Sequence, residues 1–113
     1  MAIGVDIEDI ERFKIKSQKF LDRVFTKTEQ EYCLSKTMPE SYLAVRFCAK
    51  EATIKALSAL NIKISEYKSI EVFHDKNQCP QIRLLKEIDR KLTFEVSLSH
   101  DKSKAIAFVT VKE

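Results

Sequence analysis

The chain has 113 residues, 44% of them hydrophobic, which is a usual size for one domain and enough for a core without metal or disulfide support. No apolar run approaches the roughly 20 residues that span a bilayer, and the N-terminus lacks a signal-peptide pattern. A net charge of +3 is too small to indicate nucleic-acid binding by itself. We therefore expect one domain, residues 1–113, in a cytoplasmic protein that binds neither membranes nor nucleic acid.

The cysteine spacing and the charge distribution further narrow the class of protein. Cys33, Cys48 and Cys79 are odd in number and contain no CxxC pair, which disfavours both a disulfide framework and a zinc site. Residues 12–27 hold six basic side chains and one acidic one, so the positive charge is local.

The N-terminal half predicts a strand followed by helices. Residues 3–7 form a short apolar run typical of a buried strand, and Glu8-Asp9 suits the start of a helix. In this first helix the apolar residues recur at helical spacing: Ile10, Phe13, Phe20, Leu21 and Val24. The opposite face would carry the residues that we call the basic stripe: Arg12, Lys16, Lys19 and Arg23.

Two capping signatures predict the helices that follow. Thr26-Lys27-Thr28-Glu29 fits a capping box ahead of a short second helix. Thr37-Met38-Pro39-Glu40 repeats the signature, with proline in the first turn, ahead of the longest helical pattern, which should run to about Leu60.

The C-terminal half predicts strands. Residues 69–74 and 81–85 should form two strands joined by a turn at 75–78, and Pro80 suggests that the second begins at a sheet edge. Residues 94–100 alternate, and residues 105–111 supply a partner strand in a terminal hairpin. Together, these expected helices and strands predict an α+β fold, with a small antiparallel sheet packed against one long and two shorter helices.

Taken alone, the candidate chemical residues have structural explanations. Asp6 ends an apolar strand, where a carboxylate is costly unless paired or bound to a cation, but capping the next helix would also explain it. Glu51 precedes Lys55 by one turn, as in a solvated ion pair. His100 fits a polar residue at the mouth of a loop. Spacing alone favours the structural explanation for each.

Three separated segments nevertheless match one family in order and at compatible spacing. They are Ile3-Gly4-Val5-Asp6-Ile7 with Ile10-Glu11-Arg12, Arg46-Phe47-Cys48-Ala49-Lys50-Glu51-Ala52 with Lys55-Ala56, and Val96-Ser97-Leu98-Ser99-His100-Asp101. In these segments the chain resembles the holo-acyl-carrier-protein synthases, which are small bacterial phosphopantetheinyl transferases. It differs at Ser58-Ala59-Leu60-Asn61, where the family usually has a glycine-bearing turn, and at Gln78-Cys79-Pro80, where Gly-Lys-Pro is common.

The resemblance implies a phosphopantetheinyl transferase fold and a reaction. The 4'-phosphopantetheine arm of coenzyme A would pass to a serine of apo-acyl carrier protein, with release of 3',5'-ADP, in support of fatty acid biosynthesis. Asp6 and Glu51 would bind Mg²⁺, and Glu51 would accept the serine proton. Lys55 would stabilise the leaving phosphate, and Arg46, Lys55 and His100 would hold coenzyme A.

The resemblance also implies partners. The basic stripe would meet the acidic carrier protein, where complementary charge speeds and orients encounter. Family members form homotrimers with active sites between subunits.

Two other functions remain open on the sequence. A Mg²⁺-dependent phosphodiester hydrolase could use Asp6, Glu51 and Lys55 with water as the nucleophile. A non-enzymatic adaptor could bind an acidic protein or RNA through the basic stripe, although the absence of tryptophan weakens the case for RNA.

Overall fold

The computed structural model describes residues 1–113 and has an α+β architecture with two antiparallel sheets. The larger sheet has the strand order β1-β5-β4, from β1 (Ala2–Asp9), β5 (Lys104–Lys112) and β4 (Thr93–His100). The smaller pairs β2 (Ile70–His74) with β3 (Pro80–Leu84). The α-helices are α1 (Gln18–Val24), α2 (Lys27–Leu34) and α3 (Pro39–Ser58), and the 3-10 helices are η1 (Ile10–Phe13) and η2 (Tyr67–Ser69).

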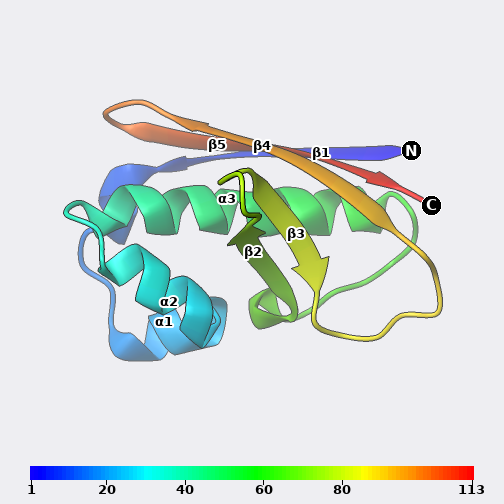
Figure 1. Ribbon diagram of the computed structural model, residues 1–113, viewed down its shortest axis with the longest axis horizontal. Coiled ribbons are helices and arrows are strands. Elements are labelled where there is room, and N and C mark those ends of the chain that lie inside the picture. The colour runs from blue at the N-terminus through cyan, green and yellow to red at the C-terminus, as the bar shows by residue number, and fades with distance from the viewer.

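Helix α3 forms the middle of the molecule. It runs along one face of the three-stranded sheet, with α1 and α2 on its other side (Figure 1). Because it is covered from both sides, α3 is buried around most of its circumference, which explains its many alanines. This arrangement confirms the predicted α+β class, with one long and two shorter helices.

The only glycine fixes how closely β1 approaches α3. A Cβ built on Gly4 would lie 1.9 Å from the carbonyl oxygen of Ala52, so a side chain cannot fit there. The same approach brings Asp6, two residues further along β1, against Lys55 of α3.

The prediction of one continuous helix after the first strand is wrong. Strand β1 extends to Asp9 because it pairs with β5 as far as Lys104, so Glu8 and Asp9 belong to the strand. The chain then forms η1, and a separate α1 begins after Ser17, whose Oγ accepts a hydrogen bond from the backbone of Phe20 at 3.1 Å. The basic stripe therefore does not lie on one helix.

The capping predictions have opposite outcomes. The box at Thr26 and Glu29 is confirmed, because Thr26 Oγ1 accepts from the Glu29 backbone and Glu29 Oε1 accepts from the Thr26 backbone. The second box is wrong, because α3 is capped at Met38 without a side-chain hydrogen bond, although Pro39 does occupy its first turn.

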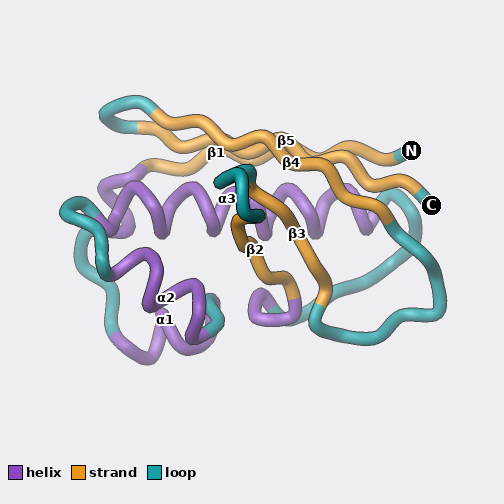
Figure 2. Tube along the Cα trace, in the orientation of Figure 1, coloured by secondary structure: helices purple, strands orange, loops and turns teal.

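The predicted bounds of the strands agree with the observed ones within about two residues. The two longest connections lie near the ends of the chain. The connections from α3 to β2 and from β3 to β4 lie at the end of the molecule where both termini lie (Figure 2). The α2–α3 and β4–β5 turns lie at the opposite end.

None of the helices has the length and apolarity needed to cross a bilayer. Cys33 and Cys48 are buried, Cys79 is exposed, and all three are free thiols.

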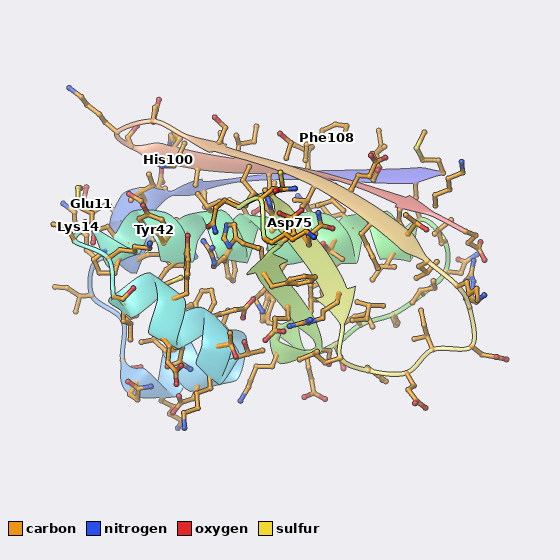
Figure 3. The ribbon with its side chains drawn as sticks, viewed as in Figure 1. Glu11, Lys14, Tyr42, Asp75, His100 and Phe108 are labelled. Atoms are coloured by element: carbon orange, nitrogen blue, oxygen red, sulfur yellow. The ribbon has the colours of Figure 1, made fainter.

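The two faces of the larger sheet differ in what covers them. The face toward α3 is buried, whereas the opposite face exposes a row of large apolar side chains. We call this the outer apolar face: Ile3, Val5, Ile7, Ile106 and Phe108. Val5 lies opposite Phe108 and Ile7 opposite Ile106 in the β1–β5 pairing. Figure 3 shows Phe108 on the side of the sheet away from α3.

Candidate active site

Asp6 and Lys55 meet where β1 passes α3. Lys55 Nζ lies 3.2 Å from Asp6 Oδ1 and donates to the carbonyl oxygen of Val5 at 2.9 Å. The other oxygen, Asp6 Oδ2, is buried and has no hydrogen-bond partner. A buried carboxylate oxygen without a partner is costly, so this oxygen is available for a cation or a donor that arrives with a ligand.

Glu51 lies on the same helix as Lys55 but is not paired with it. Its partner is the hydroxyl of Tyr67, which donates a hydrogen bond to Glu51 Oε1. This hydrogen bond, burial and the charges of Glu51, Glu8 and Asp6 raise the pKa of Tyr67 to about 12, so the hydroxyl stays protonated at neutral pH. The simple ion pair that spacing favoured for Glu51 and Lys55 is therefore wrong.

A third carboxylate, Glu8, joins this group and was not predicted as a site residue. Because strand side chains alternate, Glu8 shares the face of β1 that carries Asp6. Burial and the neighbouring Asp6 raise the pKa of Glu8 to about 7, while its ion pair with Arg12 acts in the opposite direction. We call Asp6, Glu8 and Glu51 the acidic cluster. The period of two would have revealed Glu8 had the strand been extended to Asp9.

The acidic cluster can be tested for its fit to a divalent cation. No group of three or more His, Cys, Asp or Glu side chains is arranged to hold a metal by itself. Mg²⁺, however, usually binds one or two protein carboxylates and takes its other ligands from substrate phosphates and water. The free oxygen of Asp6 and the carboxylate of Glu51 fit that requirement.

Arg46 and His100 lie together at a second place. Both line a cavity of about 140 Å³ between α2, α3, β2 and β4, which none of Asp6, Glu51 and Lys55 lines. In Figure 3, His100 and Tyr42, which also lines this cavity, lie toward the end of the molecule that carries the β4–β5 turn. Within one chain the predicted site residues therefore divide into two groups.

Arg46 is a buried cation without a carboxylate partner. It is 3% exposed and forms none of the ion pairs in the chain. Its Nη1 donates to the carbonyl oxygen of Tyr42 at 3.3 Å, its guanidinium carbon lies 4.4 Å from the Tyr32 ring centre, and its Nε has no partner. A buried guanidinium with a free donor beside a cavity suits an anionic ligand.

Lys50, which precedes Glu51, has a different role. Its Nζ is fully buried and lies 2.8 Å from Glu29 Oε1, and it also donates to the carbonyl oxygens of Tyr67 and Ile70. Desolvation lowers the pKa of Lys50, opposed by Glu29. Glu29 in turn accepts from the backbone of Val72 at 2.7 Å, so the pair ties α2 and β2 to α3.

The basic stripe is divided over three segments. Arg12 lies in η1 and bonds Glu8, and Lys16 lies in the connection with its Nζ 4.6 Å from the Phe20 ring centre. Lys19 and Arg23 are one turn apart on α1, and both are exposed. Only these two share a helix face.

The sequence and the fold match those of one class of enzymes. Residues 2–109 match the model of the 4'-phosphopantetheinyl transferase superfamily. The holo-[acyl-carrier-protein] synthase of Caldicellulosiruptor saccharolyticus is 43% identical over 113 residues, covering 93% of this chain and 90% of that protein. The corresponding protein of Protochlamydia amoebophila is 39% identical over 115 residues, covering 96% and 94%.

Solved structures agree with the sequence relatives. The ACPS–CoA complex of Chronobacterium ammoniagenes has a TM-score of 0.85 at 25% identity, covering 98% of this chain and 96% of that one. The Helicobacter pylori holo-[acyl-carrier-protein] synthase in complex with coenzyme A has a TM-score of 0.77 at 30% identity, covering 97% and 99%. The chain belongs to the 4'-phosphopantetheinyl transferase superfamily, and the relatives it matches over nearly their whole length are holo-[acyl-carrier-protein] synthases.

Proposed function

We propose that this chain transfers 4'-phosphopantetheine from coenzyme A to a serine of apo-acyl carrier protein, releasing 3',5'-ADP and supporting fatty acid biosynthesis. The observation that carries the proposal is the free, buried oxygen of Asp6 beside Lys55, with Glu51 close by on the same helix. Carboxylates and a cation in one place are what a phosphate-transfer site requires. The names of the relatives supply the substrates.

Asp6 and Glu51 would hold Mg²⁺ together with the phosphates of coenzyme A. When bound, Mg²⁺ neutralises charge on phosphate oxygens and so lowers the barrier to attack by an oxygen nucleophile. Lys55 now neutralises one oxygen of Asp6, and Tyr67 orients the carboxylate of Glu51. These contacts keep both ligands in place before the substrate arrives.

The transfer itself would use Glu51 and Lys55. The serine hydroxyl oxygen attacks the phosphorus that bears the pantetheine arm, and the bond from that phosphorus to the bridging oxygen of 3',5'-ADP breaks. Glu51 accepts the serine proton. Lys55 stabilises the charge on the leaving phosphate. The side chain of Lys55 is 53% exposed, so its ammonium group can reach a ligand at the surface.

Arg46 and His100 would hold another part of coenzyme A, in keeping with the unpaired guanidinium at their shared cavity. They lie apart from the acidic cluster within one chain, so one copy's Arg46 and His100 would serve the acidic cluster of its neighbour. The outer apolar face supports such an assembly, because an exposed apolar patch of this kind is typical of a contact surface. We propose a homotrimer with active sites between subunits.

The carrier protein would approach along the basic stripe. Lys19 and Arg23 present two positive charges on one face of α1, and Arg12 and Lys16 lie on the path from α1 to the acidic cluster. An acidic partner would be steered by these charges more than it would be tightly held by them.

Release of 3',5'-ADP tests this proposal against hydrolysis. We expect release from coenzyme A only when apo-acyl carrier protein and Mg²⁺ are both present, with one mole of 3',5'-ADP for each mole of carrier modified. Release without the carrier protein would instead support the phosphodiester hydrolase. Absence of release under all conditions, with the carrier protein still bound, would support the adaptor.

A further inference from the structure

His74, at the end of β2, contacts the guanidinium of Arg46. Arg46 Nη2 lies 3.3 Å from Nδ1 and 3.4 Å from Nε2 of the imidazole. Because Nη2 is nearly equidistant from the two ring nitrogens, it lies over the face of the imidazole and not along either in-plane lone pair. The contact therefore favours the neutral imidazole, because protonation would bring two cations into contact.

Tyr32 of α2 holds both partners of this contact. Its ring stacks on the His74 ring with 5.0 Å between centres and 28° between planes, and the Arg46 guanidinium carbon lies 4.4 Å from the same ring centre. The imidazole, the phenol ring and the guanidinium thus form one packed group at the wall of the cavity that His100 also lines.

The charges around His74 favour its neutral form. Arg46 faces it from α3 and Lys36 from the turn after α2, with Lys36 Nζ 4.4 Å from the centre of the Tyr32 ring. Asp75, the next residue in the β2–β3 turn, is the one acidic group that opposes them. Burial, Arg46 and Lys36 together lower the pKa of His74 below its ordinary value, against the effect of Asp75. The other titratable groups lining the cavity are His100 from β4, Tyr32 from α2 and Tyr42 from α3.

We propose that His74 is a positioning residue for Arg46: its neutral imidazole packs against the guanidinium and holds it toward an anionic group of the nucleotide substrate. This inference rests on the proposed function, because it takes coenzyme A as the ligand of the cavity. Protonation of His74 places two cations against each other, so Arg46 loses its orientation. Coenzyme A binding should therefore weaken on acidification in a way that depends on His74.

Direct binding of coenzyme A, measured by calorimetry with Mg²⁺ present and without carrier protein, tests this role across pH 8 to 5.5. Wild type should lose about tenfold more affinity over this range than His74→Asn, since protonation of His74 brings two positive charges into contact. Asparagine keeps a planar, neutral side chain but takes up no proton, so His74→Asn should match wild type at pH 8. The phosphates of coenzyme A also titrate, and the comparison with His74→Asn removes their contribution.

Further variants make the result specific. His74→Ala should bind weakly at every pH, because it removes the planar group that packs against Arg46. His74→Gln takes the place of His74→Asn if that variant fails to fold. The chain has only two histidines, so His100→Asn is the matched control and should retain the pH dependence whatever its effect on affinity.

The outcomes separate this inference from the proposed function. Equal pH profiles for wild type and His74→Asn would overturn the role of His74 alone, as would wild-type binding that tightens on acidification. The transfer reaction would remain in place in both cases. Failure of wild type to bind coenzyme A at any pH would overturn the proposed function and the inference with it.

Discussion

Lys55 reaches across from α3 to β1 and lies 3.2 Å from Asp6, whereas Lys50, on the same helix, turns inward to Glu29 at 2.8 Å. The two lysines are five residues apart and differ in almost every physical respect. The side chain of Lys55 is half exposed and that of Lys50 is fully buried. One lysine is thus placed to contact a ligand and the other to hold three elements together.

This contrast predicts opposite effects of the same substitution. Lys50→Met leaves Glu29 buried without its partner and should lower the free energy of unfolding by about 3–5 kcal/mol. Lys55→Met removes only a partly exposed pair and should change it by less than about 1 kcal/mol, while slowing transfer by about 10²-fold. Urea unfolding at one fixed protein concentration, together with transfer rates, would check both. Transfer by folded Lys55→Met at the wild-type rate would refute its assignment to the reaction.

Gln78 is expected to carry backbone strain. Its φ is 63°, in the left-handed region, which costs a residue with a side chain about 1–2 kcal/mol relative to right-handed conformations. Gln78→Gly relieves that cost but adds freedom to the unfolded chain, so we predict a net gain of about 0.5–1 kcal/mol in thermal or urea unfolding. Lys76→Gly, in the same turn but without a positive φ, is the control and should not stabilise the protein. If both variants behaved alike, strain at Gln78 would not be the cause.

The exposed charges on α1 should act mainly by steering. Lys19→Gln combined with Arg23→Gln should reduce kcat/KM for the carrier protein by about tenfold at low ionic strength. The defect should largely disappear at about 1 M salt, where the Debye length is about 3 Å. Lys63→Gln combined with Lys86→Gln removes the same charge from exposed positions in the two long connections and should have little effect. A defect of equal size at both salt concentrations would argue against steering.

The outer apolar face should be a subunit contact. Phe108→Glu places a charge at the centre of this face and should convert a trimer to monomers in sedimentation experiments. Transfer should fall with it, because the Arg46 cavity and the acidic cluster of one chain are separate. Lys63→Glu should leave the assembly unchanged. A wild-type monomer with full activity would exclude active sites shared between subunits.

Much of the fold follows from local patterns. The alternation in β4 and β5 and the capping box at Thr26 lie within short stretches of sequence and were predicted nearly as observed. The break between η1 and α1 was not, because Ile10 and Phe13 of η1 and Leu21 of α1 keep a spacing that also fits one helix. What ends the strand and delays the helix is pairing with β5, which lies almost a hundred residues away.

Only part of the candidate site could be predicted from the sequence. Asp6, Glu51 and Lys55 stand in recognisable motifs, but their contacts depend on the close approach of β1 to α3 at Gly4. Tyr67 lies in a segment without any motif, although it orients Glu51. His74 is equally inconspicuous in sequence, and only the packing of β2 against α2 and α3 brings it to Arg46. The catalytic roles themselves stay predictions.

The first measurement should be intact-mass spectrometry of an apo-acyl carrier protein after incubation with this protein, coenzyme A and Mg²⁺. We predict a mass increase equal to one phosphopantetheine group with wild type, and none after chelation of the metal. Asp6→Asn and Glu51→Gln should remain folded and should reduce the yield by at least about 10²-fold, because each removes a charged metal ligand. Unmodified carrier proteins from several pathways, or full modification by Glu51→Gln, would contradict the assignment of this site to phosphopantetheine transfer.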